Sequence, residues 1–279
     1  MIFLFRDTRP IIINQNYYIV YCFLSKNLNL FADLQTRAIQ YNFEGINYDG
    51  TPAEQSVSLN FLNPKFGVFF ILNSNSAFYA SYSVANKEPN RNDYIENPPS
   101  SRPKHETLYD TELGWKFNAK NISLGINLYN MDYNNQLINT GAINDVGYYV
   151  RSNITDSYRK GIEIVSGIKI TEKLNWNANL TFSENKIVEY AEYVDNWDTG
   201  IQKKFDYENT NISLSPSLIG KSQLNYTIGN LQSSWILKHI GKQYMDNTNS
   251  SDRMLSAYSV NNVLFTYTMT FKNIKEARI

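Results

Sequence analysis

The sequence predicts an all-β fold of long antiparallel up-and-down strands, about ten of them, that form part of a larger closed sheet. Three observations predict it: apolar and polar side chains alternate with a period of two, the alternating segments are long, and short and long connections alternate. The segment 174–183 shows the period clearly. Leu174, Trp176 and Phe182 share one face while Asn175 and Asn179 share the other, whereas at a helical period these residues would scatter around the axis.

In chain order, the alternation predicts ten strands and the start of an eleventh near Ile274. The ten cover residues 27–43, 56–72, 76–87, 105–118, 121–135, 146–170, 174–190, 213–228, 231–245 and 257–271. The second strand changes phase around Asn63, Pro64 and Lys65. Because proline cannot donate a ladder hydrogen bond, this change predicts a β-bulge there.

Strand length and connections indicate the kind of sheet. Several predicted strands exceed the mean soluble strand of about 5–6 residues, and a strand that crosses a bilayer needs about 9–11. Short turns are expected at residues 73–75, 119–121, 171–173 and 229–230, and long loops at 44–55, 88–104, 136–145, 191–212 and 246–256. Because transmembrane barrels alternate short turns with long loops, the chain is predicted to supply part of a transmembrane β-barrel.

Aromatic residues of the apolar phase lie close to the short turns. This position predicts an aromatic girdle at one membrane interface, although the same residues could be core aromatics of a sandwich. The six residues are Trp115, Phe117, Trp176, Tyr226, Trp235 and Phe271.

Charged residues within the strands fall mainly on the polar phase. A Lys or Arg on the lipid face at mid-depth would cost about 2–4 kcal/mol, so these charges are expected to face the lumen of the barrel. The residues assigned to the lumen are Arg37, Glu112, Lys116, Arg159 and Glu163. Asp156 and Lys160 fall on the other phase and are expected to lie beyond the bilayer on the long-loop side.

Composition excludes several functional classes. The 26 Lys and Arg balance the 26 Asp and Glu, so the chain has no basic footprint for nucleic acid. One cysteine forbids an intrachain disulfide, and the chain has no apolar run long enough for a transmembrane helix. The two histidines, His105 and His239, have no partner at ligand spacing. We therefore expect no enzyme activity, no catalytic residue, no cofactor and no metal site.

Several segments resemble the C-terminal barrel half of TonB-dependent receptors. They are residues 31–41 (FADLQTRAIQY), 78–94 (FYASYSVANKEPNRNDY), 111–117 (TELGWKF), 127–137 (NLYNMDYNNQL), 152–164 (SNITDSYRKGIEI) and 176–187 (WNANLTFSENKI). The resemblance covers residues 27–279 and implies a barrel of about 22 strands filled by an N-terminal plug. It also implies energy relayed by TonB for the uptake of a scarce ligand of siderophore, haem, cobalamin or glycan type.

The chain departs from the complete family pattern, since it shows no plug and no segment that contacts TonB. Residues 1–26 stay unassigned, and residues 27–279 are expected to form a partial barrel. The resemblance implies the outer membrane of a Gram-negative bacterium. The expected partners are outer-membrane lipid, a plug, the remaining barrel strands and, through the intact receptor, the TonB complex. Because open sheet edges are costly in hydrocarbon, the chain alone is not expected to transport.

Ligand contacts are expected on the long loops and the upper lumen wall, where binding residues concentrate. The candidates are Arg91, Asn92, Tyr94, Tyr149, Arg151, Tyr193 and Trp197. Each could also be an ordinary aromatic or polar residue of a barrel rim. Two other functions remain open at this point: a passive porin-like barrel, and a secreted β-rich adhesin or glycan-binding protein without a membrane span.

Overall fold

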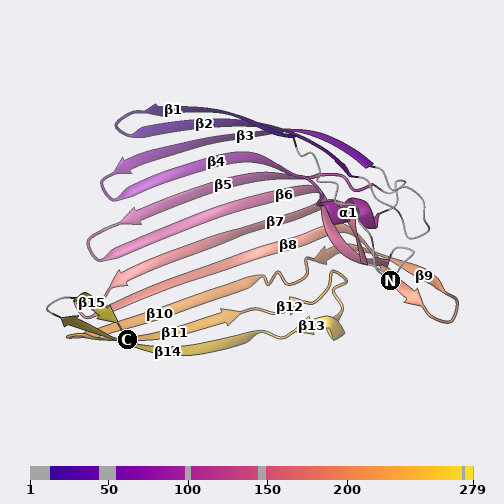
Figure 1. The fold of residues 1–279 in the computed structure, drawn as a ribbon. Helices are drawn as coiled ribbons and strands as arrows, with labels where there is room; N and C mark the ends of the chain where they lie inside the picture. Colours follow the sequence, from indigo (N-terminus) through magenta and orange to yellow (C-terminus); the bar gives the residue numbers. More distant parts are fainter. Residues whose placement is uncertain (1–12, 44–54, 98–101, 144–148, 272–273, 279) are drawn as a thin grey trace.

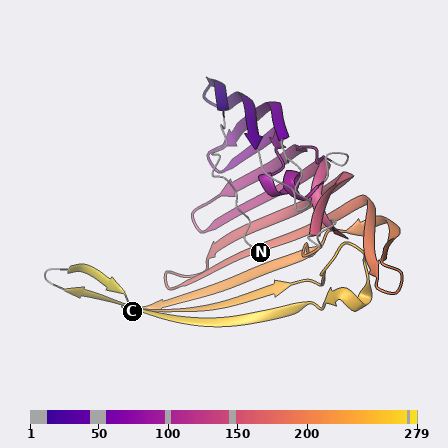
Figure 2. The same ribbon diagram turned by 45° about the vertical axis from the view of Figure 1, so that its right-hand side comes forward.

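The computed structural model describes residues 13–43, 55–97, 102–143, 149–271 and 274–278. Its main element is one 13-stranded antiparallel sheet in the order β1-β2-β3-β4-β5-β6-β7-β8-β10-β11-β14-β15, with β9 paired to β8 beside this path. Figures 1 and 2 show a curved, twisted sheet in which strands follow one another in chain order. The prediction of an all-β, up-and-down sheet is confirmed.

The strands are long, and most bounds lie close to those predicted from the alternation. They are β1 (Ile13–Leu24), β2 (Leu28–Phe43), β3 (Gln55–Asn73), β4 (Ser76–Lys87), β5 (Glu106–Asn118), β6 (Ile122–Ile143), β7 (Tyr149–Lys169), β8 (Leu174–Asn196), β9 (Ile201–Asn211), β10 (Leu218–Ile228), β11 (Leu231–Ile240), β12 (Gln243–Tyr244), β13 (Met254–Leu255), β14 (Tyr258–Phe271) and β15 (Ile274–Arg278). A short helix, α1 (Arg91–Glu96), and a 3-10 turn at Ser251–Arg253 complete the described elements.

Three segments differ from the sequence-based expectation. β1 lies within the unassigned residues 1–26, where the run YYIVYCFL is apolar on both phases and so shows no alternation. The expected loop at 191–212 is mostly a hairpin of β8 and β9, and the expected loop at 136–145 is largely the end of β6. The last residues of β8 (AEYVDN) and those of β9 (IQKKFDYENTN) do not alternate regularly between apolar and polar, so the period used to find strands does not detect them.

The two ends of the sheet are built differently, and we call them the turn end and the loop end. Short turns join consecutive strands at the left in Figure 1, while α1, β9, β12 and β13 lie at the right. Side chains stabilise the tight turns. The Ser25 hydroxyl accepts a hydrogen bond from the Leu28 amide (2.9 Å), and the Thr171 hydroxyl accepts one from the Leu174 amide (3.0 Å).

The predicted bulge at Pro64 is wrong. The pairing of β2 with β3 runs without a register shift through Leu34 and Pro64, and the shift between β3 and β4 falls at Ile71 and Asn73. Proline is tolerated at position 64 because the pairing of β3 with β4 ends at Lys65, so no β4 partner needs an N–H from residue 64. The phase change is instead a change of polarity along an unbroken strand, since apolar side chains point to one face before residue 62 and to the opposite face after it.

Buried apolar residues form only small clusters near the loop end. One cluster joins Ile154, Ile187, Tyr190 and Ile212, and another joins Val57 to Tyr94 of α1. A sandwich would bury apolar side chains along the whole length of its strands. Here, in contrast, large apolar residues along the rest of the described strands are exposed, which excludes two sheets packed around a dry centre.

Candidate functional site

The main sheet has two chemically different faces. Glu112 and Lys116 of β5 lie on the face that we call inner, and Leu113 and Trp115 lie on the outer face. Directly paired residues share a face, so the register extends both faces across the sheet. This pairing puts all the sequence-assigned lumen residues on the inner face, namely Arg37, Glu112, Lys116, Arg159 and Glu163.

Cations of the inner face lie over aromatic rings of neighbouring strands. The charged group is 5.0–5.8 Å from the ring centroid in four pairs: Arg37 with Phe61, Lys65 with Phe31, Lys116 with Tyr79, and Arg159 with Tyr133. Such contacts stabilise a cation by about 0.5–1 kcal/mol at exposed sites. They hold the long side chains against the wall. Arg37 also forms an ion pair with Glu88, whereas Lys65, Lys116 and Arg159 take part in none of the ion pairs of the described residues.

Ion pairs are absent from the middle of the described inner face. None of the charged residues at this level takes part in one of the ion pairs of the described chain: Asp33, Lys65, Asp110, Glu112, Lys116, Arg159 and Glu163. Three buried atoms also lack a hydrogen-bond partner, Asp33 Oδ1, Asp110 Oδ1 and Arg159 Nε. Asp33, Asp110 and Arg159 are at one level of the sheet, joined by direct pairing from strand to strand. This level therefore requires water or a polar partner.

Glycines make room for the inner-face aromatics. Tyr79 lies so close to Gly114 that an added Cβ would be 2.0 Å from its ring. A Cβ at Gly67 would be 2.7 Å from the Phe31 ring, and one at Gly161 would be 2.7 Å from the Tyr129 hydroxyl. The Tyr79 hydroxyl donates to Asn127 Oδ1 at 3.0 Å. The aromatic side chains therefore occupy the space that a side chain would need at each of these three glycine positions.

The outer face is apolar and ends in aromatic residues near the turn end. Five of the six residues assigned to the girdle lie on the outer phase of their strands, and the side chain of the sixth, Phe271, lies outside the described part. The three indoles assigned to the girdle have polar partners: Trp115 Nε1 donates to Ser76 Oγ (2.7 Å), Trp176 Nε1 to Ser222 Oγ (2.9 Å) and Trp235 Nε1 to Asn261 Oδ1 (3.1 Å). Satisfied N–H groups allow these rings to lie in an apolar surface.

The outer face turns polar before the loop end. Lys160 Nζ lies 3.0 Å from Glu184 Oε2, and the Tyr158 hydroxyl donates to Glu184 Oε1 at 3.1 Å. On the same strands the next outer residues toward the turn end are Ile162 and Phe182, which are apolar. This boundary limits the apolar belt on the loop side.

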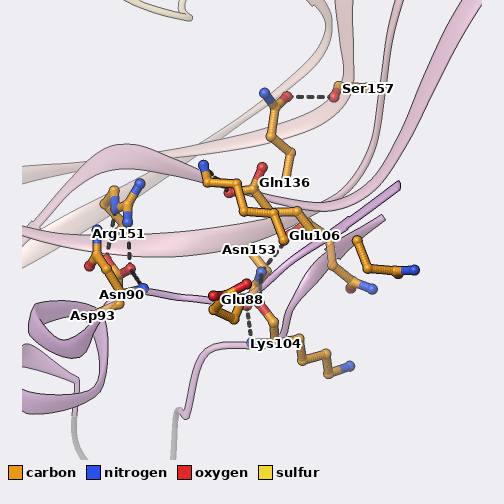
Figure 3. A network of polar contacts seen from close by, with 12 residues as sticks. Glu88, Asn90, Asp93, Lys104, Glu106, Gln136, Arg151, Asn153 and Ser157 are labelled. Atoms are coloured by element: carbon orange, nitrogen blue, oxygen red, sulfur yellow. Dashed lines mark hydrogen bonds and ion pairs between the residues drawn. The ribbon is translucent and has the colours of Figure 1, made fainter. Parts of the chain in front are cut away.

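At the loop end, a clamp holds α1 against the sheet (Figure 3). Arg151 of β7 contacts both carboxylate oxygens of Asp93, with Nε donating to Oδ1 at 2.7 Å and Nη2 pairing with Oδ2. The backbone N–H of Asn90 donates to Asp93 Oδ2 at 2.7 Å, and the side-chain amide of Asn97 donates to the backbone carbonyl of Asp93 at 2.7 Å. The Asp93 side chain is 4% exposed, so this is a buried, bidentate ion pair.

A second polar cluster joins the β8–β9 hairpin to the loop after β11. Arg253 Nη1 lies 2.5 Å from Glu192 Oε1 and 2.7 Å from Asp246 Oδ2. Burial alone would raise the pKa of Asp246, but hydrogen bonds from Arg253 and Thr248 outweigh it and hold that pKa below its usual range. Nearby, burial followed by the charge of Glu192 raises the pKa of Tyr190 to about 12.

The sequence-assigned ligand candidates divide into accessible and inaccessible residues. Arg91 and Asn92 are exposed on α1, and Trp197 is 90% exposed at the tip of the β8–β9 hairpin. Tyr94, at 2% exposure, and Arg151, in the clamp, hold α1 in place and so serve structure in this conformation. Sequence reasoning missed Asp93, because nothing in the sequence shows which cation it meets.

The two remaining candidates add little to this picture. Tyr193 is half-buried on β8, and the side chain of Tyr149 lies outside the described part. Among the described residues, no group of three or more His, Cys, Asp or Glu side chains could hold a metal ion. No described helix is long and apolar enough to cross a membrane.

Comparisons with known proteins identify relatives of this sheet. A family model described as TonB dependent receptor-like, beta-barrel, matches residues 16–278. Similar solved structures include the siderophore receptor PiuA from Acinetobacter baumannii (15% identity, TM-score 0.72), the ferric yersiniabactin uptake receptor FyuA from Yersinia pestis (13%, 0.66) and the ferric citrate transporter FecA (17%, 0.71). At these identities the likeness shows the fold alone.

The matches cover 90–92% of this chain but only 36–38% of those three chains. The chain thus spans less than two fifths of the length of the solved structures it resembles. No curated protein matches the sequence.

Proposed function

This chain belongs to the TonB-dependent receptor family, as part of its β-barrel, and we propose that it helps to form an outer-membrane receptor for the active uptake of a scarce ligand. Members of this family are transport receptors of the outer membrane, and the neighbours are named as transporters and receptors. In this proposal residues 27–279, together with β1 ahead of them, supply one part of the barrel wall.

The observation that carries the proposal is the contrast between the two faces. The outer face exposes apolar residues. The middle of the inner face instead holds charged residues, such as Lys65, Glu112 and Arg159, that take part in none of the ion pairs of the described residues. Unpaired charges are stable beside water or a polar protein surface and costly beside acyl chains. The inner face is therefore proposed to line a lumen, and the outer face to contact lipid.

Two kinds of partner follow from this arrangement. The edge strands β1 and β15 each pair on only one side in the described sheet, and open edges are costly within a bilayer. We propose that further strands close the barrel and that a plug meets Arg37, Glu112, Lys116, Arg159 and Glu163 through charge-assisted hydrogen bonds. The TonB complex would act only through the intact receptor.

The ligand class is proposed from the family and the neighbours together. PiuA is named as a siderophore receptor and FecA as a ferric citrate transporter, while another neighbour is named as the copper transporter OprC. Arg91, Asn92 and Trp197 are the accessible loop-end residues that could meet such a ligand. We propose a scarce nutrient of siderophore, haem, cobalamin or glycan type, with metal chelates as the first to test.

Cysteine labelling tests which face meets lipid. In a Cys22→Ser background, because Cys22 is exposed, single cysteines replace Glu112, Lys116, Leu113 or Trp115 in the whole receptor in native membranes. Positions 112 and 116 are expected to react with a water-soluble maleimide, and positions 113 and 115 only with a lipid-soluble one. The reverse pattern would overturn the proposal.

Uptake itself is tested by growth. A strain that lacks the gene is expected to lose growth on one of a panel of ferric siderophores, haem, cobalamin or glycans supplied as limiting nutrient. Complementation should restore growth only where TonB is present. Restoration without TonB would show passive entry instead.

A further inference from the structure

One hollow interrupts the apolar outer face. It measures about 530 Å³ and opens to the surface over β3, β4, β5 and β6. Its walls are apolar side chains of these four strands: Val68, Phe70, Phe78, Leu113, Trp115 and Leu128. We call this hollow the outer niche. Its volume lies in the range of about 300–1,000 Å³ that small-molecule sites occupy.

The niche lies over the smallest outer residue of its ladder level. Ala80 lies in a ladder level whose other outer residues are Val68, Leu113 and Leu128, all larger. The next level toward the turn end is bulky throughout, with Phe70, Phe78, Trp115 and Ile126. Gly114 and the backbone of Tyr79 form part of the floor. The niche thus lies over Ala80 and is bordered by larger side chains of its own level and of the next.

The position of the niche favours one kind of occupant. Ala80 lies four residues from Val84, the last apolar outer residue of β4 before Asn86, and so about 13 Å along the strand at about 3.3 Å per residue. An apolar belt in a barrel is about 25 Å tall, so Ala80 and the niche lie near the middle of the belt, away from both membrane surfaces. Its side walls carry no charged residue.

We propose that the outer niche binds one acyl chain of an outer-membrane lipid. This inference rests on the proposed function, because it requires the outer face to lie in the membrane. An acyl chain fits because the niche is apolar, open toward the membrane and continuous with the lipid-facing belt. Phe78 and Leu113 confine the chain laterally, and the Trp115 indole closes the turn-end side with its N–H already bonded to Ser76.

The test compares variants that fill or enlarge the niche. The whole receptor is purified from outer membranes and its bound lipids are counted by native mass spectrometry as detergent is exchanged. Ala80→Phe fills the niche, and Leu113→Ala removes one wall. Ala178→Phe is the matched control, since Ala178 is also an outer-face alanine but lies on β8, away from the niche.

Wild type and Ala178→Phe are expected to retain one more lipid than Ala80→Phe and Leu113→Ala. The mass of that lipid distinguishes a phospholipid from a lipopolysaccharide. Equal lipid counts in all four proteins would overturn the inference. If the labelling of positions 112, 113, 115 and 116 nevertheless keeps its expected pattern, the proposed function stands and only the niche fails.

Discussion

Three glycines of the inner face allow a graded test of how tightly this wall is packed. An added Cβ at Gly125 meets nothing within 4 Å. At Gly114 it would lie 2.0 Å from the Tyr79 ring, which is the far end of a movable side chain. At Gly161 it would lie 2.4 Å from the Phe182 carbonyl oxygen, which is backbone, and 2.7 Å from the Tyr129 hydroxyl.

The expected costs follow from what each Cβ displaces. Gly114→Ala should swing Tyr79 away, losing its hydrogen bond to Asn127, about 1 kcal/mol, and its contact with Lys116, about 0.5–1 kcal/mol. Gly161→Ala should cost more, because moving a paired strand in a packed site adds about 1–3 kcal/mol. Gly125→Ala should be neutral or stabilise by roughly 0.4–1 kcal/mol, since alanine restricts the unfolded chain.

The assay is urea unfolding of the whole receptor in lipid vesicles, followed by the loss of heat-modifiable mobility. Stability should fall in the order Gly125→Ala, Gly114→Ala, Gly161→Ala. Adding Tyr79→Ala to Gly114→Ala should cost little more, because the ring has already lost its contacts. A Gly114→Ala receptor as stable as the Gly125→Ala receptor would refute the reasoning.

Three further predictions concern the clamp, the lipid face and the loop-end cluster. Arg151→Ala leaves the buried Asp93 carboxylate unpaired, so trypsin should cleave near α1 several-fold faster than in wild type. Leu128→Arg should destabilise the receptor by about 2–4 kcal/mol in urea unfolding, whereas Ser81→Arg, on the inner face beside Glu112, should not. Because the folded pKa of Asp246 is lowered, its contribution is present above the unfolded pKa of about 3.9 and lost as pH falls through the folded value. Protection of this loop from an acid-active protease should therefore drop below about pH 4 in wild type, but not in Asp246→Asn.

Period-two alternation predicted most of the sheet, because within a bilayer each face meets one environment. Residues 174–183 alternate without exception, and β8 begins at the predicted residue Leu174. The signal failed in two strands, for different reasons. β1 is apolar on both phases, and β9 lies on a hairpin at the loop end.

The candidate site was less accessible to sequence reasoning. Pleat phase placed Glu112 and Lys116 on one face, because phase is a local property. It could not foresee that Tyr94 is buried against Val57 or that Arg151 pairs with Asp93, 58 residues away, since these contacts join segments far apart in the sequence. It also could not find the outer niche, which depends on Ala80 standing beside the side chains of three other strands.

The level at which the outer face turns polar gives a measure of strand tilt. The last apolar outer residue before this change is Leu62 on β3 and Phe182 on β8. Phe182 shares its ladder level with Val68, so the boundary moves by six residues, from 62 to 68, across five strand spacings. With about 3.3 Å per residue and about 4.8 Å per strand, the shift is about 20 Å over about 24 Å. Strands tilted by about 40° would produce it, within the range of about 35–45° for membrane barrels.

This tilt predicts which residues share a depth in the membrane. Spin labels at Leu62→Cys and Phe182→Cys should report equal depth from their relative accessibility to oxygen and to a water-soluble nickel complex. A label at Val68→Cys should lie deeper than one at Phe182→Cys, although the two positions are level in the ladder. Equal depth for positions 68 and 182 would mean that the strands stand upright, and the polarity change on β3 would then need a cause other than the membrane surface.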